Sequence, residues 1–305
     1  MRKAILLVAL ALLSVAVVAQ EAAPAQQSSM PKYQTNLTER PQAPSYSDLY
    51  CSGFISNESM NMTNTVGAGI NSPNETQFGT HNTVYLLGSG YQEGTLYTVL
   101  RPLRDPNRYE PFKGQRKEVQ ALGQPYAEVA RVRVKALRGP AAVADVEFAC
   151  QQISVGDIVV PFREHPAVEY RKTTTFEEFP TGQARVNGRI VMAREFDTQV
   201  GTGQKIYISA GADKGIKVGD YFRIVRGYDK EHIDPVDATA YKAPPGDDTQ
   251  KIPGRVTPEV TKLLPMHTLG EAIVLNVTPT SCTAMITNAV YNIQVGDQVQ
   301  LESGQ

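Results

Sequence analysis

The sequence predicts an all-β protein: two small antiparallel β-barrel-like domains in tandem, related by an internal duplication. Three observations lead to this prediction. Landmarks recur in the same order in both halves, strand-like alternation dominates both halves, and only short stretches favour a helix. Short strands that close into a barrel leave no exposed sheet edge, so closure is the expected arrangement.

The chain begins with the features of a secretory signal peptide, which we expect to be cut after residue 19. Arg2 and Lys3 precede a nearly all-apolar run over residues 4–18, and Ala19 supplies the small residue that cleavage requires. A membrane anchor is the alternative, but this run is shorter than the about 20 residues that span a bilayer. We therefore expect an exported protein without a transmembrane segment after cleavage.

Residues 20–50 are rich in Ala, Gln, Pro and Ser, and we expect them to form a flexible tether. The two barrels are then expected over residues 51–163 and 186–305. The connector between them, residues 164–185, carries Phe176, Phe179 and Pro180 and is therefore expected to pack on one of the domains.

Five landmarks of the first repeat match the second repeat in order. The matched pairs are residues 53–55 with 188–190, 84–86 with 206–208, 94–101 with 219–226, 122–123 with 269–270, and 153–157 with 293–297. Insertions fall between the landmarks, as expected when loops vary more than packed strands. The largest insertion covers residues 227–267 and is rich in proline, and such long loops are either functional or disordered.

A hairpin is the clearest local prediction in each repeat. Apolar residues alternate with basic ones over residues 130–136, a turn follows at residues 137–140, and alternation resumes over residues 144–148. Residues 272–277 and 283–287 predict the matching hairpin in the second repeat. Each repeat reads as about six short strands, and short helices are expected only at residues 116–121 and 258–264.

The three cysteines predict one disulfide and one buried thiol. Superposing the repeats places Val186 opposite Cys51 and Val290 opposite Cys150, so both partners are missing together from the second repeat. An exported chain lies where disulfides persist, and we therefore expect a bond between Cys51 and Cys150. Cys282 aligns with a small alanine and is expected to be a buried residue without reactivity.

Residues 211–220, 224–226, 269–272 and 293–299 resemble the C-terminal domain family of flagellar assembly protein T. The resemblance covers the second repeat well and the first loosely, because residues 91–95 lack the full run of spaced glycines. It implies a small β-barrel-like module in the periplasm or outer envelope of a Gram-negative-type bacterium. The other domains of the flagellar protein are not recognisable in this chain, so a flagellar role stays open.

No catalytic or metal-ligating constellation is predicted, and no cofactor is expected. The Gly-Asp pairs at residues 156–157, 219–220 and 296–297 recur as scaffold residues do, so we interpret them as turns in which the carboxylate binds backbone amides. Residues 67–69 and 201–203 are likewise expected to be hairpin turns rather than phosphate loops. An enzyme is the least favoured alternative. It would require the insertion to bring His232, Asp234 or His267 against acids of the other repeat.

A basic strand face is the first candidate for contact with a ligand or partner. Arg131, Arg133 and Lys135 point to one side of the predicted hairpin. The competing interpretation is local, because the turn would bring Arg133 near Asp145 and Arg131 near Glu147 across the two strands. Cross-strand pairing would then account for most of this charge.

Tyrosines are the second candidate, since sugar-binding sites often stack their ligands on aromatic rings. The chain has 14 Tyr and no Trp. Tyr85 and Tyr207 occupy duplicated strand positions and are expected in the core, whereas Tyr228 and Tyr241 in the insertion are freer to bind a glycan or a partner.

Together these observations predict a non-enzymatic exported envelope protein that acts as an interaction or assembly module. The alternative is a glycan-binding module that holds the protein at peptidoglycan. The expected partner is therefore an envelope protein or peptidoglycan. A formal net charge of −1 argues against a general attraction to nucleic acid. The oligomeric state stays open.

Overall fold

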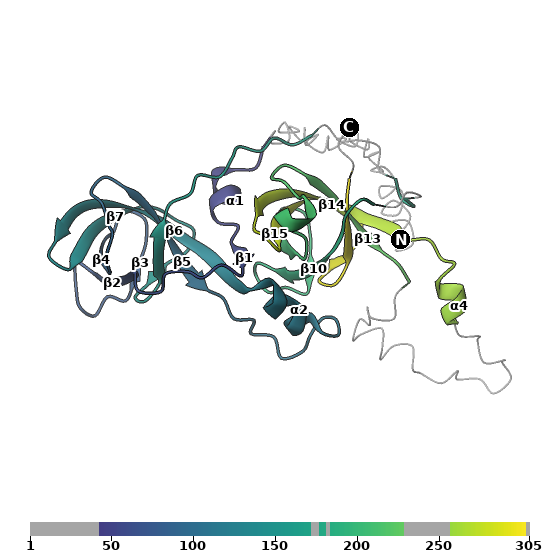
Figure 1. Cartoon of the computed structure of the whole chain (residues 1–305), viewed down its shortest axis with the longest axis horizontal. Coiled ribbons are helices and arrows are strands. Elements are labelled where there is room, and N and C mark those ends of the chain that lie inside the picture. Colours follow the sequence, from purple (N-terminus) through teal and green to yellow (C-terminus); the bar gives the residue numbers. More distant parts are fainter. Residues whose placement is uncertain (1–42, 172–176, 181–183, 229–256, 303–305) are drawn as a thin grey trace, which may run out of the picture. The chain divides into compact units, whose positions relative to one another are not determined.

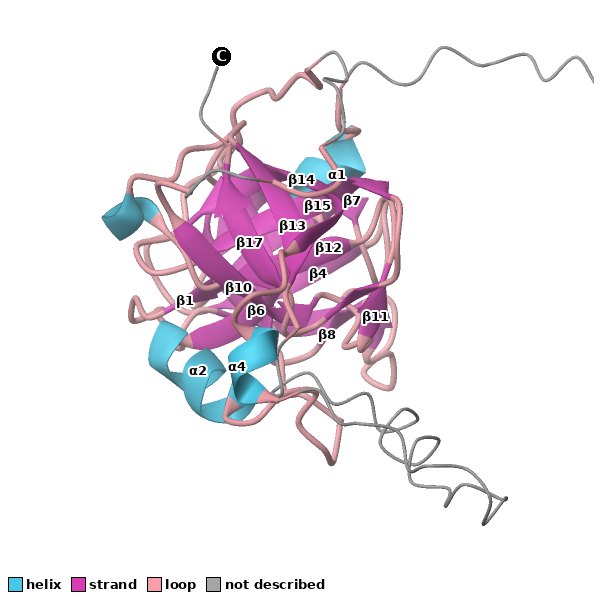
Figure 2. Ribbon diagram, turned by 90° about the vertical axis from the view of Figure 1, so that its right-hand side faces the viewer, coloured by secondary structure: helices cyan, strands magenta, loops and turns pink. Residues whose placement is uncertain are grey.

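The computed structural model describes residues 43–171, 177–180, 184–228 and 257–302, which belong to one compact unit. Two closed six-stranded antiparallel barrels follow one another along the chain, as predicted (Figures 1 and 2). None of the helices in these ranges is long and apolar enough to cross a bilayer.

Barrel one closes through the pairing of its two longest strands. Its ring order is β2 (Thr65–Gly69), β4 (Thr83–Leu87), β7 (Ala141–Ala149), β6 (Gln124–Arg138), β5 (Leu96–Pro102) and β9 (Ile158–Pro161), with β6 pairing both β5 and β7. A short strand, β1 (Phe54–Ser56), pairs with the beginning of β6 outside the ring. A two-stranded sheet of β3 (Gln77–Phe78) and β8 (Ile153–Ser154) completes the domain.

Barrel two repeats this plan strand for strand. Its ring order is β10 (Asn187–Ala193), β12 (Lys205–Ile208), β15 (Cys282–Ala289), β14 (His267–Val277), β13 (Tyr221–Arg226) and β17 (Gln298–Leu301). Its two-stranded sheet pairs β11 (Gln199–Val200) with β16 (Ile293–Gln294). The two predicted hairpins are therefore β6–β7 and β14–β15.

Shared irregularities establish that the two barrels are copies of one unit. The ladder between β6 and β7 is interrupted between Val134 and Ala136, and the ladder between β14 and β15 is interrupted between Val274 and Asn276. Three more interruptions correspond: Arg131/Val132 with Glu271/Ala272, Val99/Leu100 with Ile224/Val225, and Val66/Ala68 with Ile190/Met192. A bulge is a specific departure from regular pairing, so this coincidence confirms the predicted duplication.

Two of the five landmark pairs were nevertheless wrong. Residues 54–56 form β1, which lies outside the ring, and the true counterpart of β10 is β2. Leu122 ends a helix, whereas Leu269 lies inside β14 and corresponds to Val129 of β6. An apolar residue beside a glycine occurs at helix ends and within strands alike, so the pair alone does not identify an element.

One predicted turn is also a strand. Residues 201–203 lie in a turn as expected, but residues 67–69 belong to β2. A Cβ on Gly67 would lie only 2.7 Å from Cγ of Leu87. Glycine is present there because the leucine of the neighbouring strand packs across its backbone.

Helices are few among the described residues, and the two expected ones are present as α2 (Gln115–Leu122) and α4 (Pro258–Thr261). There is also a 3₁₀ turn at Ala212–Lys214. Helix α1 (Tyr46–Tyr50) lies in the stretch that we expected to be a tether. Ser45 begins it with a capping box, in which its side chain accepts the amide of Asp48 and the Asp48 carboxylate accepts the amide of Ser45.

Each barrel encloses its own apolar core. The inward side chains alternate with outward ones along the strands, for example Val84 and Leu86 of β4 in barrel one, and Ile206 and Ile208 of β12 in barrel two. Cys282 is in the second core, where burial raises the pKa of its thiol, as expected of an unreactive residue.

The predicted disulfide between Cys51 and Cys150 is present, with a Cα–Cα distance of 5.5 Å. It ties the segment after α1 to the end of β7. The prediction is confirmed, but the superposition behind it was partly wrong. Cys51 precedes the duplicated ring, because the counterpart of β10 is β2, and therefore Val186 is not its equivalent.

All three Gly-Asp pairs form the expected turn. The glycine has a positive φ each time, of 92° at Gly156, 90° at Gly219 and 109° at Gly296. The following aspartate accepts the backbone amide three residues earlier, from Ser154, Lys217 and Gln294 respectively, at 2.7 to 2.8 Å. These aspartates are therefore scaffold residues.

Two of these turns also hold a duplicated ion pair. Arg101 binds both carboxylate oxygens of Asp157 at 2.8 and 2.7 Å, and Arg226 binds both oxygens of Asp297 at 2.7 and 2.8 Å. Each arginine also donates to a backbone carbonyl of the same turn. A two-pronged pair with a buried carboxylate fastens the last strand of each ring to its neighbour.

Asp297→Asn is expected to lower the free energy of unfolding by about 3 kcal/mol, because it leaves the Arg226 guanidinium beside a buried neutral group. The matched control is Asp220→Asn. Asp220 lies in the same kind of turn but accepts one backbone amide at 2.8 Å, so its loss should cost under about 1 kcal/mol. Urea unfolding of both variants tests this expectation, and equal losses would contradict it.

Candidate functional site

The basic strand face is largely neutralised by the neighbouring strand. Arg133 and Asp145 are directly opposite in the ladder, as the local interpretation required. The ion pairs differ in detail: Arg131 and Arg133 both pair with Glu147, and Lys135 pairs with Asp145 at 2.7 Å. The guanidinium of Arg131 also lies over the rings of Tyr46, at 5.3 Å from its centroid, and of Phe162, at 5.6 Å. These side chains already have partners within the chain, which favours the structural interpretation.

The insertion tyrosines are only partly within the described ranges. Tyr228 is 59% exposed immediately after β13, so its ring is open to solvent. Tyr241 lies outside the described residues, as do His232 and Asp234. Within the described ranges, no three His, Cys, Asp or Glu side chains lie close enough together to hold a metal ion.

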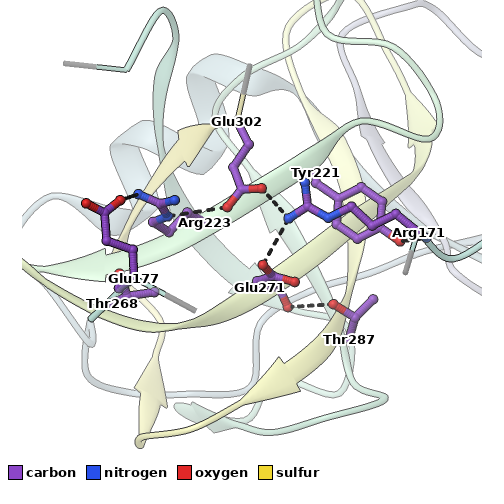
Figure 3. Close-up of polar contacts among 8 residues, drawn as sticks. All are labelled: Arg171, Glu177, Tyr221, Arg223, Thr268, Glu271, Thr287 and Glu302. Carbon is purple, nitrogen blue, oxygen red and sulfur yellow. Dashed lines mark hydrogen bonds and ion pairs between the residues drawn. The ribbon is translucent and has the colours of Figure 1, made fainter. Parts of the chain in front are cut away.

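A charged cluster holds the connector against barrel two (Figure 3). Arg171 pairs with Glu271 at 2.9 Å and with Glu302, while Arg223 pairs with Glu302 at 3.3 Å and with Glu177 at 3.1 Å. The two arginines and three glutamates largely cancel one another. The cluster therefore fastens Arg171, Glu177 and Glu302 to barrel two. His165, at the start of the connector, lies 3.1 Å from Glu128 of barrel one, so the connector contacts both domains.

Tyr85 and Tyr207 are equivalent residues with opposite environments. They occupy the same position on β4 and β12, and both point out of their barrels rather than into the cores. Tyr207 is 1% exposed, whereas Tyr85 is 38% exposed. The expectation that both belong to the barrel core was therefore wrong. Tyr207 is buried by residues from outside its own barrel.

The outer face around Tyr207 is covered by the segment that follows the disulfide. The Tyr207 hydroxyl donates to the carbonyl of Ser52 at 3.1 Å, and the Thr283 hydroxyl donates to the carbonyl of Gly53 at 2.7 Å. Burial raises the pKa of the Tyr207 phenol. We call Met192, Tyr207 and Thr283 the covered face.

A glycine is needed where the segment crosses this face. Gly53 has a φ of 68°, and a Cβ there would lie 2.6 Å from both the Tyr207 hydroxyl and a carbonyl of β6. Its amide donates to the buried carboxylate of Glu128 at 3.1 Å. The close approach lets the segment's backbone carbonyls reach the hydroxyl groups of barrel two.

The corresponding face of barrel one is open and apolar. Ala68, Tyr85 and Val143 correspond to the residues of the covered face, and Leu87 lies next to them on β4. Leu87 is 47% exposed. We call Ala68, Tyr85, Leu87 and Val143 the open face. The hydroxyl of Thr283, which binds a backbone carbonyl, is replaced here by the methyl groups of Val143.

The sequence holds a signal for this face that our interpretation missed. Residues 84–87 are an unbroken apolar run, and a strand with only one buried face alternates instead. Such a run indicates that the outward side chains also meet something apolar.

No family model matches this chain, and no curated protein matches it. The shape and chemistry of its surface are therefore the basis on which a function can be proposed.

Proposed function

We propose that this chain is a non-enzymatic exported envelope protein that acts as an interaction or assembly module, and that it binds protein through the open face of barrel one. The observation that carries the proposal is the contrast between Tyr85 and Tyr207. The same outward position is buried under protein in one barrel and open in the other.

The chemistry of the open face supports a protein partner over a small or charged ligand. Tyr85 and Leu87 are large side chains on adjacent outward positions of one strand, and no charged side chain lies among the four residues of the face. Burying a side chain of this size contributes about 1.5 to 3 kcal/mol before the cost of association is subtracted. In barrel two, the partner of the corresponding face is an extended protein segment.

An exported location is supported by two features. The disulfide between Cys51 and Cys150 suits an oxidising compartment, and the first 19 residues have the pattern of a signal peptide. The resemblance of repeat two to the flagellar assembly family agrees with a location in a bacterial envelope. It concerns the barrel fold and implies no mechanism.

Glycan binding is the second candidate, and the exposed ring of Tyr228 favours it. It predicts that residues 20–305 sediment saturably with purified peptidoglycan sacculi and that Tyr228→Ala loses this binding. Absence of saturable sedimentation by the unmodified protein would contradict this candidate. Sedimentation that survives a Tyr228→Ala, Tyr241→Ala double variant would exclude these tyrosines as its site.

Photo-crosslinking in cells that export the chain tests the proposed function. A photo-reactive amino acid at Leu87 is expected to capture a protein, and Tyr85→Glu in the same chain should reduce the product at least tenfold. The control position is Tyr109, which is 87% exposed and lies away from the open face in sequence and strand order. No product from Leu87, or an equal product from Tyr109, would overturn the proposal.

A further inference from the structure

The contact around Tyr207 between the two barrels consists of a face and two segments, while α1 packs separately on β14 and β15 of barrel two. The face is the covered face of barrel two. The first segment is residues 52–56, in which the fully buried Ile55 packs with Met192 and Tyr207. The second is α2, whose apolar residues Val119 and Leu122 pack on the same cluster. Barrel one therefore contributes the segments, and barrel two contributes the face.

The first segment of this contact has a counterpart in repeat two. Residues 52–56 lie beside β6, where Gly53 donates its amide to Glu128. The corresponding residue of β14 is Thr268, and it binds the connector: its amide donates to the carbonyl of Glu178 at 2.8 Å, and its hydroxyl to that of Glu177 at 2.6 Å. The next residue, Phe179, is 51% exposed.

The second segment also has a counterpart. Helix α2 lies in the connection from β5 to β6, and α4 lies in the corresponding connection from β13 to β14. The apolar side chains of α2 pack against barrel two, whereas Val260, Leu263 and Leu264 at α4 are all exposed. We call residues 177–180 and 257–264 the docking segments.

Among the described residues, both halves of the internal contact thus recur with exposed apolar side chains. No described segment covers the open face of barrel one, and the exposed apolar side chains of the docking segments are not packed on a described face. We propose that copies of this chain associate head to tail, with the docking segments of one copy covering the open face of the next. This inference rests on the proposed function, because it names a second copy of this chain as the protein that binds the open face.

The geometry of such a contact makes a distinctive prediction. The two surfaces that meet are different, so a pair of copies still has one unused face, on one copy, and one unused set of docking segments, on the other. A heterologous contact of this kind continues into a chain of copies or closes into a ring, rather than stopping at a two-fold dimer. Apolar exposure at Tyr85, Leu87, Phe179 and Leu263 would then be confined to the ends of an assembly.

Sedimentation velocity of purified residues 20–305, at rising concentration, tests this inference. The unmodified protein is expected to form species larger than a dimer. Tyr85→Glu removes the face and Leu263→Glu removes a docking segment, so each variant alone should associate at least tenfold more weakly. Both side chains are exposed in the single chain, Leu263 at 81%, so neither change should disturb folding. Tyr109→Glu is the matched control and should associate like the unmodified protein.

Mixing the two variants separates a head-to-tail contact from any other. The Tyr85→Glu chain keeps intact docking segments and the Leu263→Glu chain keeps an intact face, so one contact can form between them. The mixture is expected to form a dimer and nothing larger. A two-fold contact between identical surfaces would not be rescued by mixing, and that result would overturn the inference.

The outcomes also distinguish this inference from the proposed function. If residues 20–305 stay monomeric while Leu87 crosslinks to another protein in cells, the second copy is excluded and the proposed function stands. A crosslink that joins Leu87 to a peptide of residues 177–180 or 257–264 supports both. Monomeric protein together with no Leu87 crosslink to any protein overturns both.

Discussion

Replacing Tyr207 with alanine is expected to lower the free energy of unfolding by about 4 kcal/mol. The change removes a fully buried aromatic ring between the barrels, which typically costs about 3 to 5 kcal/mol, and it leaves the carbonyl of Ser52 without its donor. Urea unfolding, followed by fluorescence or circular dichroism, measures the loss.

Tyr85→Ala is the matched control for this prediction. It makes the same chemical change at the duplicated position, but the side chain is exposed there, so the loss should stay under about 1 kcal/mol in the monomer. The difference between the two losses in the free energy of unfolding measures how much the packing of residues 52–56 on Tyr207 contributes to stability. Similar losses at both positions would mean that Tyr207 is not held by residues 52–56.

Removing the disulfide is expected to have an equally large effect. Cys51 and Cys150 are 99 residues apart, and a loop of this length is worth about 4 to 5 kcal/mol in the chain-entropy model. The bond also anchors the segment that covers Tyr207, since Ser52 and Gly53 follow Cys51 directly. Its loss should therefore loosen the contact between the barrels as well as the first barrel.

The measurement compares unfolding midpoints with and without a reductant. The Cys51→Ser, Cys150→Ser variant should resemble the reduced protein and show no further response to the reductant. The native oxidised chain should present no accessible thiol, because Cys282 is buried in the core of barrel two. A midpoint that does not change on reduction would contradict the prediction.

If the head-to-tail contact forms, the disulfide also affects assembly. The bond holds the start of residues 52–56 and so fixes the internal contact that the intermolecular one would repeat. It does not touch the docking segments or the open face. Reduction should therefore lower stability more than it lowers association at temperatures where the chain remains folded.

Local patterns in the sequence were sufficient for most of the fold. Alternation with period two identified both hairpins, because inward and outward side chains of a strand differ in polarity whatever lies further along the chain. The Gly-Asp turns were identified from two residues, since a positive φ and a short carboxylate beside backbone amides are local requirements. Landmarks made only of an apolar residue and a glycine misaligned the repeats, because that pair suits several elements.

On the basic strand face, the sequence predicted the backbone register correctly but not every ion pair. The sequence placed Arg133 opposite Asp145, and the ladder agrees, but the side chain of Arg133 turns to Glu147 instead. Backbone register follows from the turn and the alternation. The choice among nearby carboxylates depends on side-chain rotamers and on bulges that shift the strands.

Tyr85 and Tyr207 show which properties local sequence predicts and which depend on distant residues. Their sequence contexts are alike, and local pattern correctly assigns both to strands at equivalent positions. Whether an outward tyrosine is buried depends on a segment far away in sequence, here residues 52–56, which a disulfide and a glycine at Gly53 bring to Tyr207. No corresponding segment among the described residues reaches Tyr85. Long-range burial, rather than strand pattern, therefore separates the covered face from the open one.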